Sequence, residues 1–89
     1  MSEARKITDH GEIRKWAEAR GGVPTVVKGT EKRGDGAGIL RFDFGEREAR
    51  LEEVDWDTFF KTFEEKRLAL LAQDEIDGKT SRFFKFVER

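Results

Sequence analysis

The sequence predicts a two-layer α+β fold, with two helices packed on one face of an antiparallel, four-stranded sheet. Two segments, 9–20 and 55–67, carry apolar residues at helical spacing, and each is followed by two segments that alternate as strands do. A chain of 89 residues has room for one hydrophobic core. We therefore expect a single domain over residues 1–89, with the element order α-β-β-α-β-β.

Residues 1–8 are expected to form a flexible leader, and the first helix is expected to begin directly after them. Asp9 is a suitable N-cap, and Glu12 follows it at the spacing of a capping box. Gly21 and Gly22 favour a helix end, because glycine adopts the left-handed conformation without strain. One face of this helix carries Ile13, Trp16, Ala17 and the stem of Arg20.

Two strands are expected between the helices, at 23–28 and 39–44. Pro24 has no N–H to donate, which favours an edge strand or a position near the start of a strand. The four glycines of 29–38 predict a loop between the two strands. The second strand alternates apolar and charged residues, which predicts one buried face and one solvent face. Its apolar residues are Leu40, Phe42 and Phe44, and its charged residues are Arg41 and Asp43.

Residues 45–54 are rich in charge and are expected to connect the second strand to the second helix. Asp55 is the predicted N-cap of that helix. An apolar face of four aromatic side chains predicts that the helix packs against the sheet. These side chains are Trp56, Phe59, Phe60 and Phe63.

The last two strands, at 68–73 and 81–87, are expected to pair with each other. The Asp77-Gly78 dipeptide between them is a strong hairpin-turn signal. Their alternation, together with the helical stripes, predicts an aromatic core. The expected core residues are Trp16, Leu40, Phe42, Phe44, Phe59, Phe63, Phe84 and Phe86.

Composition limits the chemistry that the chain can support. It contains no cysteine and a single histidine, His10, which excludes disulfides, thiolate metal sites and imidazole clusters; we expect His10 in solvent. The 18 basic and 19 acidic residues nearly balance, but residues 1–41 carry a net charge of +3 and residues 42–89 one of −4. No apolar run is long enough to span a membrane, so we expect a cytoplasmic protein with no membrane partner.

Three segments resemble ligand-binding motifs without meeting their requirements. Gly78-Lys79-Thr80 matches the end of a phosphate-binding loop, but Gln73 stands where that loop needs its first glycine. The glycines of 34–38 lack the spacing of a dinucleotide loop, and the acidic residues of 74–77 lack the EF-hand pattern. We therefore expect no cofactor and no metal site, and a protein that is not an enzyme.

Two blocks of sequence carry a resemblance to a known family. The first block includes Trp16-Ala17-Glu18, Arg20-Gly21-Gly22 and Lys28-Gly29-Thr30, and the second includes Trp56-Asp57, Phe59-Phe60 and Ser81-Arg82-Phe83-Phe84-Lys85. Over nearly its whole length the sequence resembles a family of small, uncharacterised bacterial proteins. Members of that family are often labelled as glucan branching enzymes, an activity that in the known enzymes needs a (β/α)₈ barrel of about 250 residues. A chain of 89 residues cannot build that barrel, and the resemblance implies no site residues.

The outer face of the predicted sheet is the first candidate for a functional surface. Leu71, Phe83 and Val87 fall on the face of the last two strands that points away from the helices. This apolar patch is either covered by the leader or a connector, or open as an interface. We expect an interaction module that acts through this face or a strand edge, with another protein or a second copy of the chain as its partner.

Basic residues of the first helix and of the 28–33 loop support an alternative function. They would contact phosphates in a nucleic-acid-associated accessory protein. Salt separates the two hypotheses, because phosphate binding weakens steeply with ionic strength whereas apolar association does not. The candidate phosphate contacts are Arg14, Lys15, Lys28, Lys32 and Arg33.

Overall fold

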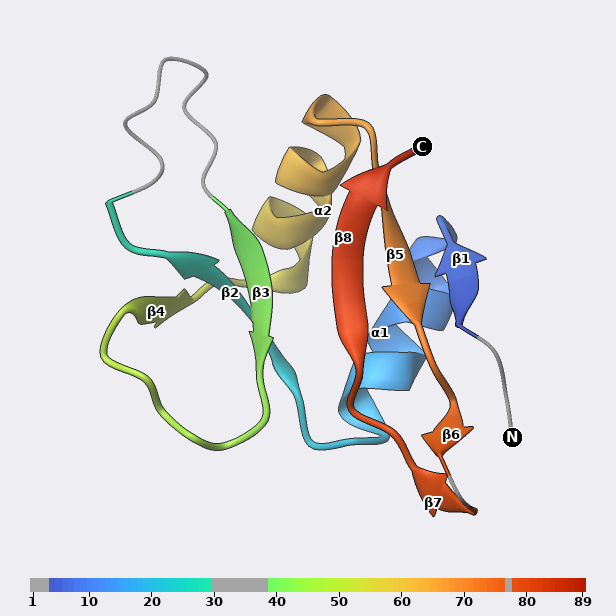
Figure 1. Ribbon diagram of the computed structural model, residues 1–89. Coiled ribbons are helices and arrows are strands. Elements are labelled where there is room, and N and C mark those ends of the chain that lie inside the picture. The colour runs from blue at the N-terminus through green and yellow to red at the C-terminus, as the bar shows by residue number, and fades with distance from the viewer. Residues whose placement is uncertain (1–3, 30–38, 77) are drawn as a thin grey trace.

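The computed structural model describes residues 4–29, 39–76 and 78–89. Within them, helices α1 (His10–Glu18) and α2 (Trp56–Glu65) lie on the same side of a layer of strands (Figure 1). The described strand pairs are antiparallel. The predicted α+β class, with two helices and antiparallel pairing, is therefore confirmed.

The layer consists of two three-stranded sheets, so the prediction of a single four-stranded sheet is wrong. The β5 sheet has the order β1-β5-β8 and contains β1 (Arg5–Ile7), β5 (Leu68–Ala72) and β8 (Phe84–Glu88). The β2 sheet has the order β3-β2-β4 and contains β3 (Leu40–Asp43), β2 (Val23–Val27) and β4 (Leu51–Glu53). The two sheets lie side by side, with β3 next to β8 (Figure 1), and no ladder of hydrogen bonds joins these two strands.

Part of the predicted leader belongs to the fold. Arg5–Ile7 form β1, which pairs with β5, and the side chain of Ile7 is buried in the core. The prediction of a flexible leader over 1–8 is therefore wrong for these three residues, because a strand this short shows no recognisable period. Residues 1–3 lie outside the described part of the chain.

The predicted connector at 45–54 also contains a strand. β4 pairs with Thr25–Val27 of β2, although both of its glutamates are exposed, so backbone pairing and not an apolar face defines it. β4 makes β2 the middle strand of its sheet, which rules out the edge position considered for Pro24. Pro24 is instead near the start of its strand, opposite Val54 and beyond the end of β4. There only its carbonyl is used, as the acceptor for the Val54 N–H at 3.0 Å.

The hairpin at the Asp77-Gly78 turn is smaller than predicted. The strands β6 (Glu75–Ile76) and β7 (Lys79–Thr80) pair on either side of the turn, and Gly78 adopts a positive φ of 75°. Asp77 itself lies outside the described residues. This hairpin is part of the loop between β5 and β8, so the strand expected at 81–87 begins only at Phe84.

Both helices begin at their predicted caps. The side chains of Asp9 and Asp55 each accept a hydrogen bond from the backbone N–H three residues later, at 2.8 and 2.7 Å. Helix α1 ends in a Schellman motif, in which the N–H of Gly22 donates to the carbonyl of Ala17 at 2.8 Å and Gly21 has a φ of 72°.

The core lies between the strand layer and the helices, around Phe42. The Phe42 ring stacks on Phe59 of α2 at 5.4 Å and meets Phe84 and Phe86 of β8 at 5.1 and 5.5 Å. Aromatic packing thus joins the two sheets where backbone hydrogen bonds do not. The predicted core residues that are buried are Trp16, Leu40, Phe42, Phe59 and Phe63. Phe44, Phe84 and Phe86 are only half-buried.

Candidate interaction surface

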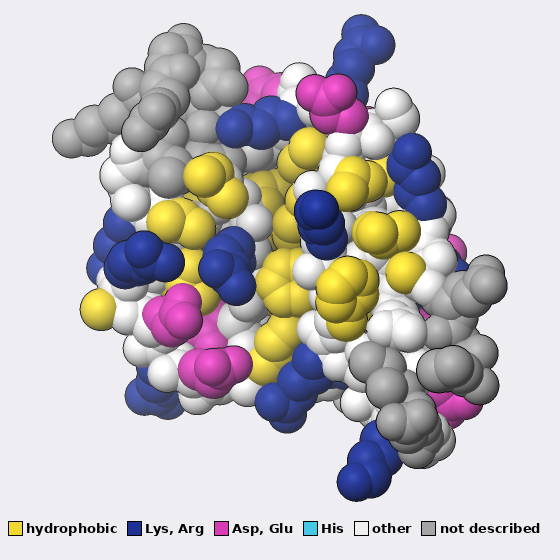
Figure 2. Space-filling model, in the orientation of Figure 1, with side chains coloured by type: hydrophobic (Ala, Val, Ile, Leu, Met, Phe, Trp, Pro, Cys, Tyr) yellow, Lys and Arg dark blue, Asp and Glu magenta, His cyan; other side chains and the backbone are white. Residues whose placement is uncertain are grey.

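No described helix or strand covers the face of the strand layer opposite the helices (Figure 1, Figure 2). The helices lie behind the strands in this orientation, and the surface shows groups of apolar side chains among charged ones. This is the face on which the sequence predicted an apolar patch.

The outer-face patch consists of Leu71, Phe83 and Val87. Phe83, directly before β8, is 45 % exposed, whereas Leu71 and Val87 are half-buried. Because Phe86 faces the core, Val87 points to the open face, and the pairing of Leu71 with Lys85 puts Leu71 on that face too. Leu71 and Val87 therefore lie beside Lys85 on the open face, and Phe83 directly precedes β8.

Two lysines interrupt the apolar surface of the patch. Leu71 lies between Lys85 of β8 and Lys6 of β1, and both lysine side chains are exposed. Since β1 lies beside β5 within the sheet, Arg5–Ile7 do not cover the patch. Among the described residues, the patch is therefore an apolar surface without a covering element, and it contains positive charge.

Arg20 holds the loop that presents Phe83. Its guanidinium donates to the carbonyls of Ser81 (2.5 Å), Asp74 (2.9 Å) and Trp16 (2.9 Å), and lies over the Trp16 ring at 4.2 Å. The Ser81 hydroxyl in turn accepts the N–H of Phe83 at 3.0 Å. Burial lowers the pKa of Arg20, but a guanidinium stays charged in proteins. The position of Arg20 at the end of an apolar stripe does not predict this role.

A second arginine fixes the same loop from β1. Arg5 makes two hydrogen bonds to the carboxylate of Asp74, at 2.9 and 3.0 Å, and a third to Glu12 at 2.6 Å. The hydrogen bonds from Arg5 lower the pKa of Asp74. The carboxylates of Glu12 and Asp74 are thus both ion-pair partners of Arg5. No local pattern predicts this contact, because 69 residues separate Arg5 from Asp74.

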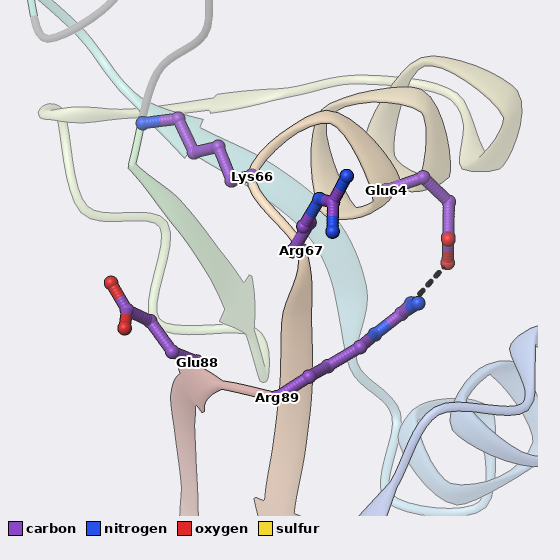
Figure 3. A pocket seen from close by; sticks show the side chains of 5 residues that line it. All are labelled: Glu64, Lys66, Arg67, Glu88 and Arg89. Carbon is purple, nitrogen blue, oxygen red and sulfur yellow. Dashed lines mark hydrogen bonds and ion pairs between the residues drawn. The ribbon is translucent and has the colours of Figure 1, made fainter.

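A hollow of about 640 Å³ lies at the C-terminal end of α2 (Figure 3). Arg89 crosses it to form an ion pair with Glu64, and also donates to the carbonyl of Leu68 at 2.7 Å. The hydrogen bonds from Arg89 and His10 lower the pKa of Glu64. Basic side chains here complement the negative end of the helix dipole, which gives them a structural role. The lining residues are Glu64, Lys66, Arg67, Glu88 and Arg89.

His10, which was expected in solvent, makes two contacts although its side chain stays 44 % exposed. The ring stacks on Phe60 at 4.2 Å, and Nε2 lies 2.7 Å from a carboxylate oxygen of Glu64. These contacts tie the first turn of α1 to α2. Among the described residues, no group of three or more histidine or acidic side chains could hold a metal ion.

The candidate phosphate contacts that the structure describes, Arg14, Lys15 and Lys28, are not gathered into one surface. Arg14 forms an ion pair with Glu18 at 3.1 Å on α1, where Lys15 is exposed. Lys28 directly follows β2, whose C-terminal end lies in the β2 sheet on the side away from α1 (Figure 1). The structure therefore separates Lys28 from the basic residues of α1. Lys32 and Arg33 lie outside the described residues.

No described helix is both long and apolar enough to cross a membrane. In comparisons with known proteins, no family model, no curated protein and no solved structure matches this chain.

Proposed function

We propose that the protein is a non-catalytic interaction module that binds a protein partner through the outer-face patch, and that a second copy of the chain is such a partner. The observation that supports this proposal is the 45 % exposure of Phe83 beside two half-buried aliphatic side chains. Removing apolar surface from water contributes roughly 25 cal/mol per Å² to association. An exposed aromatic ring on an uncovered face is therefore a favourable anchor.

Preorganisation of the Phe83 loop also supports the proposal. Three hydrogen bonds of Arg20 and Ser81 hold the loop, and Arg5 fixes Asp74 at its start. A partner therefore does not have to order this segment, which lowers the entropic cost of binding.

The outer edges of the strand layer are less suitable for association than its face. β1 and β4 form these edges, and each is only three residues long. β1 carries Arg5 and Lys6, and β4 carries Glu52 and Glu53. Short, charged edge strands oppose pairing with another chain. We therefore assign the contact to the face and not to an outer edge.

The lysines of the patch determine how the proposed dimer responds to salt. In a two-fold contact the same patch occurs on both subunits, so Lys6 and Lys85 would lie near their own copies. Salt screens this repulsion over a Debye length of about 10 Å at 0.1 M. Self-association should therefore persist, or strengthen, as the salt concentration rises.

Sedimentation velocity over a range of protein and salt concentrations tests the proposal. We expect a monomer–dimer equilibrium in the wild type and its loss in Phe83→Glu, with an unchanged circular dichroism spectrum. Ile39→Glu is the matched control, because Ile39 is also an exposed apolar residue, with 54 % of its surface exposed. Ile39 precedes β3 and Phe83 precedes β8, and these strands run in opposite directions, so the two residues lie at opposite ends of the strand layer (Figure 1). This control should dimerise like the wild type.

Two results would contradict the proposal. A strict monomer at every concentration and salt level would exclude self-association, and dimerisation unchanged in Phe83→Glu would exclude the patch. If the monomer instead bound DNA or RNA, and lost this binding with salt and in Lys32→Glu/Arg33→Glu, the nucleic-acid hypothesis would replace it.

A further inference from the structure

The junction between β3 and β8, here called the seam, exposes two strand edges to each other. On β3, the residues whose backbone groups hydrogen-bond to β2 are the odd-numbered ones, because the N–H of Val27 donates to the carbonyl of Ile39 at 2.9 Å and the ladder continues from there. The backbone groups of Leu40 and Phe42 therefore point the other way, toward β8.

The same reasoning applies to β8. The N–H of Arg89 donates to the carbonyl of Arg67 at 3.0 Å, so the odd-numbered residues of β8 bond to β5. The backbone groups of Phe84 and Phe86 therefore point toward β3. Among the described residues, none hydrogen-bonds to these seam-facing groups of Leu40, Phe42, Phe84 and Phe86. Two rows of backbone donors and acceptors thus face each other without a ladder.

The side chains along the seam show that the layer is open there. Phe44, Phe84 and Phe86 are only half-buried, although Phe42 and Phe59 beside them are buried. A hollow of about 210 Å³ is lined by residues from both sides of the seam, including Phe42, Phe44 and Phe84. The space-filling view shows apolar atoms along the centre of the face, between β3 and β8 (Figure 2).

Positive charge flanks the seam on the open face. Arg41 of β3 lies over the Phe84 ring at 6.0 Å, and Arg82 lies over the Phe44 ring at 5.6 Å. Lys85 of β8 is exposed on the same face, and Figure 2 shows basic side chains on both sides of the central apolar band. Asp43 is occupied elsewhere, because its carboxylate accepts three backbone N–H groups of the following loop. Glu46 and Glu48 belong to that loop and line the hollow as well.

We propose that the seam binds an extended acidic segment of a partner protein, which inserts between β3 and β8 as an additional strand. Its backbone would pair with the free edges, as in β-strand addition. Since β3 and β8 run in opposite directions (Figure 1), the guest strand pairs antiparallel with one and parallel with the other. Alternate acidic side chains would meet Arg41 and Lys85 on the open face, and small apolar ones would face Phe42 and Phe84.

The test uses an acetylated and amidated peptide, Glu-Val-Glu-Val-Glu-Val-Glu, added to ¹⁵N-labelled protein. Saturating peptide should slow exchange of the seam-facing amide hydrogens, those of Leu40, Phe42, Phe84 and Phe86, about tenfold or more. Replacing the central valine of the peptide with proline removes a backbone donor, and replacing glutamate with lysine reverses the charge. Each change should weaken binding at least about tenfold.

Protein variants locate the binding site. Arg41→Glu/Lys85→Glu should weaken binding of the acidic peptide at least about tenfold, and Arg41→Gln/Lys85→Gln should weaken it less. If the first variant does not fold, the second still tests the charge. Lys15→Glu/Lys61→Glu, with the same charge change on the exposed surface of the two helices, should bind like the wild type.

Several results would overturn the inference. They are unchanged exchange at millimolar peptide, equal binding of the lysine peptide, or unchanged affinity in both Arg41/Lys85 variants. The inference is separate from self-association through the patch: Phe83→Ser should impair dimerisation and leave peptide binding intact. Loss of both properties in Phe83→Ser would mean that the seam is not an independent site.

Discussion

Replacing Phe42 with alanine should remove most of the stability of the fold. Phe42 is 3 % exposed, and six other aromatic rings lie within 6.2 Å of its ring, centroid to centroid. A buried Phe→Ala substitution costs about 3–5 kcal/mol, and more where the cavity cannot collapse. Here the surrounding rings come from both helices, from β8 and from the residue directly after β3, so we expect a value in the upper half of that range. A domain of this size has a free energy of unfolding of about 4–13 kcal/mol.

Urea unfolding followed by far-ultraviolet circular dichroism measures this loss. Phe83→Ala is the matched control, because the same side chain is removed from a position that is 45 % exposed in the monomer. At a protein concentration where the chain is monomeric, the control should lose less than about 1 kcal/mol. If the two variants differed by less than about 1 kcal/mol, Phe42 would not be the residue that joins the two sheets.

Three further predictions concern the supports of the fold. Arg20→Met should lower the free energy of unfolding by about 2–3 kcal/mol and speed amide exchange in residues 78–83, because it removes hydrogen bonds to three carbonyls; unchanged exchange there would contradict this. Gly22→Ala should lower the melting temperature, because its Cβ would lie 2.8 Å from the Phe44 ring, and Phe44→Leu should recover part of the loss; no recovery would exclude the clash. The pKa of Asp74 is lowered in the folded state, so its contribution to stability is present at neutral pH and is lost as the pH falls below about 4. Asp74→Asn should therefore be less stable than the wild type at pH 7, by about 1 kcal/mol or less, and equally stable near pH 2; a constant difference would refute the assignment.

Local signals in the sequence predicted the helices and their caps well. Asp9, Asp55 and the glycine pair after α1 act within one turn of the chain, so a short segment contains the information. The apolar alternation of β3 likewise predicted which of its faces is buried.

The pairing of strands could not be predicted in the same way. β1 and β4 are three residues long, and β4 carries exposed glutamates, so backbone partners far along the chain define both strands. The division into two sheets depends on how β3 and β8 meet through Phe42 and Phe84, and no periodicity encodes that contact. The candidate patch could be predicted from alternation, whereas the arginine contacts that hold its loop, and Lys6 beside it, could not.

Amide hydrogen exchange in the free, monomeric protein tests most directly whether β3 and β8 leave an unpaired seam on the open face. The amide hydrogens of Phe42 and Phe84 point into the seam, whereas those of Arg41 and Lys85 lie in ladders with β2 and β5. We predict that Phe42 and Phe84 exchange at least about tenfold faster than Arg41 and Lys85, because only the latter are held by strand pairing. Equal protection of all four amides would mean that β3 and β8 pair directly in one continuous sheet, and would contradict the account.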